Sequence, residues 1–185
     1  MATKISLRQF QQELAQRLSS AKTEQTAAAR LGVQCGKQNW LVALDDAGEV
    51  LPVPEVLSVP LTKSWYAGVA NIRGGLFSVV DFSAYAGGEP TVRGSDARLI
   101  LAGPRFGINA ALLVTRMLGL RSARDLQARH DADERASAAA WFGPLWHETL
   151  HGAAGAAGAA PQVRMWRELK MEQLIEAPEF LNVGV

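Results

Sequence analysis

Apolar and polar residues alternate with two different periods along this chain. In the first 20 residues, apolar side chains recur three and four positions apart, which is typical of an amphipathic helix. From Leu31 onward the alternation shortens to two residues, and glycines and prolines interrupt it every few positions. Such short, interrupted runs favour strands joined by tight turns. The pattern therefore predicts an N-terminal helix followed by a mainly β protein.

The predicted helix has a recognisable start. Ser6 can serve as its N-cap, and Gln9 stands three residues later, where it completes a capping box. We expect residues 1–30 to form this helix and a linker, and residues 31–185 to form a single domain. The apolar stripe of the helix must pack against another surface. It can dock on its own domain or on a partner protein, and the sequence leaves both open.

The most informative local signal is a pair of apolar runs that flank Gly74 and Gly75. Glycine adopts the positive φ angles of a two-residue hairpin turn without a steric clash, so these two residues are predicted to form the turn. In that register Arg73 pairs with Leu76, and one face of the hairpin is wholly apolar. The other face mixes charged and apolar side chains, which suits a recognition surface without a catalytic group. The apolar face comprises Ala70, Ile72, Phe77 and Val79, and the mixed face comprises Val69, Asn71, Arg73, Leu76, Ser78 and Val80.

Further short strands are expected on both sides of this hairpin. Residues 31–35 alternate, residues 40–44 form an apolar run, and the polar residues 45–48 are typical of another hairpin turn. After the Gly74-Gly75 segment, residues 98–102 and 106–114 are predicted to form a second pair of strands. Many short strands of this kind favour a barrel architecture.

The last third of the chain combines several patterns. Residues 118–138 carry charges of both signs and are predicted to form a short solvated helix, capped at Ser122 and followed by a loop. The Ala/Gly-rich tract 151–161 is interpreted as a flexible loop between strands near residues 139–146 and 162–169. The large aromatic residues of these strands are expected in the core, because they bury much apolar area.

Composition narrows the possible function classes. The 19 Lys and Arg residues balance 18 Asp and Glu residues, so the chain lacks the positive charge expected of proteins that bind nucleic acids or anionic membranes. No apolar run approaches the roughly 18 residues of a membrane span, and no apolar leader precedes the first helix. We therefore expect a cytoplasmic protein without direct membrane insertion. The single cysteine, Cys35, excludes an internal disulfide and is expected to be a small buried hydrophobe.

One segment raises the question of catalysis. Residues 147–151 read H-E-T-L-H and match H-E-x-x-H, the helical motif in which two histidines hold zinc and the glutamate acts as a general base. A helix here would be broken at Gly152, and no third ligand stands at the extended spacing of the metzincins. We expect a coincidental match with no metal and no cofactor, and a zinc-dependent hydrolase is the alternative. The sequence contains neither a G-x-S-x-G nucleophile elbow nor a G-x-G-x-x-G phosphate loop.

At the hairpin the sequence resembles the CheW family, the adaptors that join chemoreceptors to a histidine kinase. The family signature is an N-[LIV]-R-G hairpin followed by an apolar strand that ends in an Asp-apolar pair. Here these features are residues 71–74 and Asp81-Phe82, and residues 48–56 are similar to the strand and turn that precede the hairpin. The resemblance covers roughly residues 31–114 well and the remainder weakly. Within the family, the chain is most similar to the branch used with type IV pili and twitching motility.

The resemblance implies two interleaved, five-stranded SH3-like barrels, which the predicted N-terminal amphipathic helix precedes. The run at residues 171–175 predicts a short C-terminal helix that ends before Pro178. It implies a non-catalytic adaptor whose partners are a CheA-like histidine kinase and the cytoplasmic tip of a methyl-accepting chemoreceptor. A structural pilus-assembly protein is the other non-enzymatic alternative. In the family the hairpin arginine is the residue most closely tied to coupling, and it matches Arg73. The other positions that match the interaction region are Val56, Gly68, Asn71, Ile72 and Gly74. We expect the two glycines to serve backbone geometry rather than direct contact.

Overall fold

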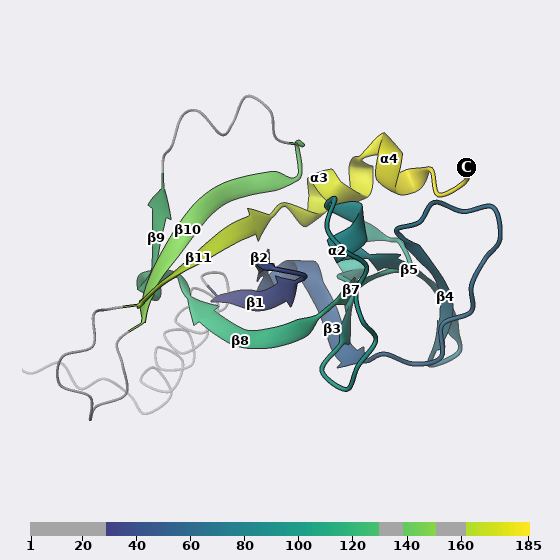
Figure 1. The fold of residues 1–185 in the computed structure, drawn as a ribbon, viewed down its shortest axis with the longest axis horizontal. Helices are drawn as coiled ribbons and strands as arrows, with labels where there is room; N and C mark the ends of the chain where they lie inside the picture. The colour runs from purple at the N-terminus through teal and green to yellow at the C-terminus, as the bar shows by residue number, and fades with distance from the viewer. Residues whose placement is uncertain (1–28, 130–138, 151–161) are drawn as a thin grey trace, which may run out of the picture.

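Strands dominate the described part of the computed structural model, which covers residues 29–129, 139–150 and 162–185 (Figure 1). Within these ranges the strands form one sheet of six and one of five. The mainly β class predicted from the sequence is confirmed. The predicted N-terminal helix and the Ala/Gly-rich tract 151–161 lie outside the described residues.

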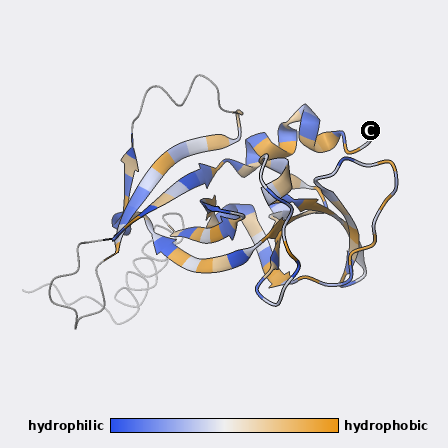
Figure 2. Cartoon of the chain, viewed as in Figure 1, coloured by the Kyte–Doolittle hydropathy of each residue, from blue (hydrophilic) through white to orange (hydrophobic). Residues whose placement is uncertain are grey.

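The six-stranded sheet contains strands from both ends of the described chain. Its members are β1 (Ala29–Cys35), β2 (Gln38–Ala43), β8 (Arg116–Ser122), β9 (Leu126–Arg129), β10 (Phe142–Leu150) and β11 (Gln162–Leu169). Their order is β8-β1-β2-β11-β10-β9. Only β2 and β11 pair in parallel, with Trp40 beside Arg167. Figure 2 shows both hydrophilic and hydrophobic residues along β8 and β10.

The five-stranded sheet is built from one continuous stretch of chain. Its members are β3 (Ala47–Pro52), β4 (Tyr66–Ile72), β5 (Gly75–Asp81), β6 (Arg98–Ala102) and β7 (Ala110–Val114). Their order is β3-β6-β7-β5-β4. The chain leaves the first sheet after β2, completes the second sheet and returns with β8. This interleaving agrees with the architecture that the sequence resemblance implied, although the first sheet has six described strands rather than five.

Strand β7 is buried on both faces because an apolar core lies on each side of it. Ala111 and Leu113 belong to a core formed by the five-stranded sheet. Leu112 and Val114 belong to a larger core, the shared core, which includes residues of both sheets. A strand buried on both faces carries a continuous apolar run instead of an alternating one, and residues 110–114 accordingly read A-A-L-L-V.

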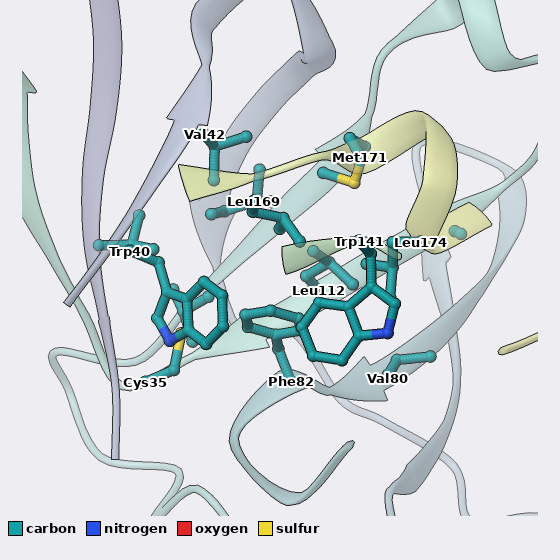
Figure 3. Close-up of a cluster of buried hydrophobic side chains, with 14 of the residues drawn as sticks. Cys35, Trp40, Val42, Val80, Phe82, Leu112, Trp141, Leu169, Met171 and Leu174 are labelled. Atoms are coloured by element: carbon teal, nitrogen blue, oxygen red, sulfur yellow. The ribbon is translucent and has the colours of Figure 1, made fainter. Parts of the chain in front are cut away.

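The shared core joins the two sheets through aromatic side chains (Figure 3). The rings of Trp40 and Phe82 meet edge to face with their centroids 5.0 Å apart, and the rings of Phe82 and Trp141 are 5.6 Å apart. Aromatic pairs in such geometry contribute about 0.5–1.5 kcal/mol beyond the area they bury. The expectation that the C-terminal aromatic residues occupy the core is confirmed for Trp141 and Trp166, whereas Trp146 is half-buried.

Two short helices close the shared core at the C-terminal end of the chain. They are α3 (Met171–Glu176) and α4 (Pro178–Leu181), and they lie across α2 (Phe82–Tyr85) in Figure 1. Leu174 and Phe180 are buried in the shared core. Pro178 ends the first helix and begins the second, because proline is tolerated only in the first turn of a helix. The predicted C-terminal helix at residues 171–175 is confirmed by α3.

The helix predicted within residues 118–138 is wrong in its described part. Strands β8 and β9 occupy this segment, joined by one 3-10 turn, η3 (Ala123–Asp125). Ser122 does cap that turn, since its hydroxyl accepts a hydrogen bond from the N–H of Arg124 at 3.3 Å. The local charge pattern did not show that β8 pairs with β1, which is far away in the sequence.

Other element boundaries also differ from the sequence prediction. Residues 45–48 do not close a hairpin, because a 3-10 turn, η1 (Leu44–Asp46), carries the chain from β2 in one sheet to β3 in the other. Strand β7 begins at residue 110 rather than 106, after another 3-10 turn, η2 (Pro104–Phe106). The strand predicted near residues 139–146 begins later and ends at Leu150.

Candidate partner-binding surface

The β4–β5 hairpin turns at Arg73 and Gly74, one residue earlier than predicted. In the observed register Asn71 pairs with Leu76. Arg73 and Gly74 have φ angles of 52° and 85°, which are the positive values of a favoured two-residue hairpin turn. The predicted Gly74-Gly75 turn and the predicted pairing of Arg73 with Leu76 are therefore wrong.

Two contacts explain the observed register. Asn71 Oδ1 accepts a hydrogen bond from the N–H of Gly74 at 2.9 Å, which closes the turn. Gly75 serves packing instead, because a Cβ at this position would lie 3.2 Å from the ring of Phe77. Moving the turn by one residue shifts each cross-strand partner by two positions. Side chains alternate with period two, so the division of the strand residues between the two faces is unchanged.

Arg73 projects from the tip of the hairpin, and its side chain is 78% exposed. Its Nη2 atom lies 2.6 Å from Oε1 of Glu49. Glu49 belongs to β3, which stands at the opposite edge of the five-stranded sheet from β4. The ion pair indicates that the sheet curls until its two edges approach each other, as in a barrel. An exposed pair of this kind contributes only about 0–1 kcal/mol, so a partner can readily replace Glu49.

Exposed apolar and amide side chains also lie on the hairpin and beside β4. Asn71 is exposed, and Leu76 beside it is 63% exposed. Leu57 extends the exposed area with a side chain that is 60% exposed. Its backbone is held by two hydrogen bonds with Val69 of β4, at 2.8 and 2.9 Å. We define the hairpin surface as Leu57, Asn71, Arg73 and Leu76.

The other residues that match the family's interaction region are less accessible. Ile72 is 8% exposed in the core of the five-stranded sheet, and Val56 is half-buried against the same core. Gly68 is buried with a φ of 127°, and a Cβ there would lie 2.1 Å from the carbonyl oxygen of Leu57. Gly68 therefore allows a positive φ angle and the close approach of the Leu57 backbone, and it does not serve as a contact residue. The predicted mixed face is wrong at Val80, which is buried because that end of β5 packs in the shared core.

The Asp81-Phe82 pair has a structural role that sequence reasoning missed. The two carboxylate oxygens of Asp81 accept hydrogen bonds from the N–H groups of Ser83 and Ala84 and from the N–H and hydroxyl of Thr91. Asp81 thus caps α2 and fastens the chain that follows α2 to the end of β5. This role could have been predicted from the sequence, because aspartate is a preferred N-cap residue of helices.

The H-E-x-x-H segment does not form the helix that its zinc motif requires. His147 and Glu148 lie in β10, where adjacent side chains point to opposite faces of the sheet. Buried Glu148 binds Nε of Arg121 and Nε1 of Trp166, each at 3.1 Å. His147 Nε2 lies 2.8 Å from Oε1 of Gln127. The geometry of a zinc hydrolase is therefore missing at these two residues, and the second histidine of the motif lies outside the described residues.

Cys35 has the setting of a core residue rather than of a nucleophile. Burial raises the pKa of its thiol well above the ordinary value, and the negative charge of Asp81 adds to this. A thiol that stays protonated is a poor nucleophile. Among the described residues, no three His, Cys, Asp or Glu side chains are grouped to hold a metal ion. The helices within the described ranges are all too short or too polar to span a membrane.

These features define a two-sheet β protein with a surface suited to protein recognition. The CheW-like domain family matches residues 30–141, more than half of the chain, and the chain belongs to this family. Protein PilI of Pseudomonas aeruginosa is 28% identical over 91 residues, which are 49% of this chain and 51% of PilI. The chain therefore spans about half the length of this relative.

A solved structure shows the same fold. Scaffolding protein TtCheW from Thermoanaerobacter tengcongensis superposes with a TM-score of 0.60 and 15% sequence identity. The superposition covers 83% of this chain and 95% of TtCheW. The resemblance read from the hairpin is confirmed by the family match, and the structural comparison shows the CheW-like fold.

Proposed function

We propose that this protein is a non-catalytic adaptor in a chemotaxis-like pathway that controls type IV pili and twitching motility. It couples the cytoplasmic tip of a methyl-accepting chemoreceptor to a CheA-like histidine kinase. It works in the cytoplasm, where it is recruited to receptor arrays at the inner membrane. Membership of the CheW-like family supports the adaptor role, and the similarity to PilI supports the connection with pili.

The hairpin surface is the observation that carries this proposal. Its arginine is presented on a two-residue turn that is held by the Asn71 side chain. Leu76 and Leu57 add exposed apolar side chains on β5 and beside β4. A planar guanidinium next to exposed apolar side chains is typical of energetically important contacts between proteins. We place the principal partner contact at Arg73, with Asn71 and Leu76 beside it.

The Arg73–Glu49 ion pair allows a sharp test of this contact. Arg73→Glu should lower binding of the kinase and the receptor, because a glutamate at the tip repels any carboxylate that faces it. The exchange Arg73→Glu with Glu49→Arg restores an ion pair within the chain but presents the wrong charge at the tip. We expect binding to stay low in the exchanged protein. Recovery of binding there would show that Arg73 acts only through Glu49, and the assignment would be wrong.

Co-purification from the native cell separates the adaptor from a structural pilus-assembly protein. A tagged adaptor should retain a CheA-like kinase and a methyl-accepting receptor together. Retention of pilus-assembly components without either signalling protein would contradict the proposed function.

A further inference from the structure

A recess of about 720 Å³ lies where α3 and α4 pass over α2 and the residues just before β10. It is distinct from the hairpin surface, with which it shares no residue. Its lining residues lie just before β4 and β10 and on or between α2, α3 and α4, whose arrangement Figure 1 shows. The side chains that decide its chemistry are Lys63, Trp65, Tyr85, Trp141, Gln173, Glu176 and Glu179.

One wall of the recess is aromatic. Trp65 and Tyr85 meet edge to face with their ring centroids 5.0 Å apart, and the rings of Tyr85 and Trp141 are 5.4 Å apart. Aromatic faces attract cations, and Nζ of Lys63 lies 5.8 Å from the centroid of Trp65. The wall therefore already holds one positive charge of the chain itself.

The helices α3 and α4 add acidic and amide side chains to the recess. Glu176 and Glu179 are exposed, and neither forms an ion pair with another described residue. Gln173 Oε1 is buried and accepts no hydrogen bond within the described ranges. A buried acceptor without a donor is unfavourable. Burial and the negative charge of Glu179 both raise the pKa of Tyr85.

We propose that this recess binds an arginine side chain of a partner protein. A guanidinium is planar and stacks on aromatic rings, and its five donors suit the two exposed carboxylates. The two glutamates outnumber Lys63, so the charge balance of the recess also favours a cation. The volume accommodates the side chain together with its flanking backbone. This contact does not depend on Arg73, and it stands even if the hairpin surface has another role.

Nuclear magnetic resonance can test the proposal with small probes. The chain has five tryptophans, and their indole N–H signals report separately on different places. Titration with Nα-acetyl-arginine amide should shift the signals of Trp65 and Trp141. The signals of Trp40, Trp146 and Trp166, which do not line the recess, should stay in place. Nα-acetyl-citrulline amide has the same shape without the charge, and we expect it to bind about tenfold more weakly.

Matched variants complete the test. The double variant Glu176→Gln, Glu179→Gln should weaken arginine binding about tenfold, because it removes both charged acceptors. Glu172→Gln changes an exposed glutamate of α3 that does not line the recess, and it should leave binding unchanged. Circular dichroism should show the same fold for all three proteins. Equal shifts with citrulline, equally tight binding of Nα-acetyl-lysine amide, or unchanged binding in the double variant would each overturn the proposal.

Discussion

Gly68 and Gly74 both have positive φ angles, but only Gly68 is enclosed by other backbone. In Gly68→Ala the new Cβ would lie 2.1 Å from the carbonyl oxygen of Leu57, whereas ordinary contact begins near 3.4 Å. The bridge between Leu57 and Val69 must then move, and we expect a loss of about 3 kcal/mol of unfolding free energy. In Gly74→Ala no atom lies within 4 Å, so only the left-handed conformation is penalised, by about 1 kcal/mol. Urea denaturation of both variants measures the difference, and equal losses would contradict the structural role given to Gly68.

Asp46 is a buried carboxylate whose charged form is unfavourable in the fold. Burial raises its pKa above the usual 3.8, the charges of Asp45 and Glu172 raise it further, and the ion pair with Arg105 lowers it. The folded protein therefore binds this proton more tightly than the unfolded chain. Protonated Asp46 therefore stabilises the folded protein. This stabilisation is complete below pH 3.8 and is lost as the pH rises through the pKa that Asp46 has in the folded protein.

The variant Asp46→Asn should remove this component of the pH dependence. Its oxygen still accepts from Arg105, so the melting temperature at neutral pH should equal or exceed that of the parent protein. Melting curves from acidic to neutral pH make the comparison. A clear loss of stability at neutral pH would show that the Arg105 ion pair outweighs burial.

The sequence predicted which residues form the hairpin, but it did not predict which two of them form the turn. A glycine pair is the favoured turn, and Arg73 at a φ of 52° is an uncommon choice for a residue with a side chain. The decisive facts are the Asn71 hydrogen bond to Gly74 and the Phe77 ring over Gly75. Both depend on side-chain positions that the alternation of apolar residues does not specify. Arg73 was identified as a surface residue because its charge does not suit a core.

At the scale of elements, α3 and α4 are too short to be stable alone and depend on packing. Leu174 of α3 is fully buried in the shared core, whereas Leu181 of α4 is 62% exposed. Leu174→Ala should therefore lower the free energy of unfolding by about 3 kcal/mol. Leu181→Ala, the control, should change it by no more than about 0.5 kcal/mol. Chemical denaturation distinguishes the two, and a small effect of Leu174→Ala would mean that α3 is not part of the cooperative core.

The elements that the sequence predicted well are those with a strong local pattern. Strand β6 has the predicted bounds, because its apolar run ends at Gly103-Pro104, and β11 has the predicted bounds, because the Ala/Gly-rich sequence before it marks its start. Strands β8 and β9 were missed, because their charged residues resemble those of a solvated helix. Strand β8 forms by pairing with β1, which is distant in the sequence. Strand β9 forms by pairing with β10, which follows it after a long connection. Such pairing cannot be read from local composition.

At the scale of the whole molecule, one apolar core holds both sheets together. The shared core contains Trp40 of the first sheet, Leu112 of the second and Leu174 of the C-terminal helices. The two sheets should therefore unfold in one cooperative step. Tryptophan fluorescence and far-ultraviolet circular dichroism should give coincident denaturation curves. Two separate transitions would show that each sheet is an independent folding unit.

The sequence indicated the family and the two-sheet plan, but it did not show how the sheets share a core. Strand β7 illustrates the reason. Its continuous apolar run predicts burial on both faces, yet nothing in residues 110–114 indicates that one face meets the six-stranded sheet. The position of the recess beneath α3 and α4 depends on the same packing, so sequence reasoning did not reveal it.

We propose that this protein links a receptor to a kinase, and a binding measurement with all three components can show whether it does. The cytoplasmic segment of a methyl-accepting receptor is immobilised, and retention of a CheA-like kinase is measured with and without the protein. We expect the protein to increase kinase retention and Arg73→Glu to abolish the increase, although the variant keeps the circular dichroism spectrum and melting temperature of the parent. Kinase retention that is unchanged by the protein, with all components folded, would contradict the account.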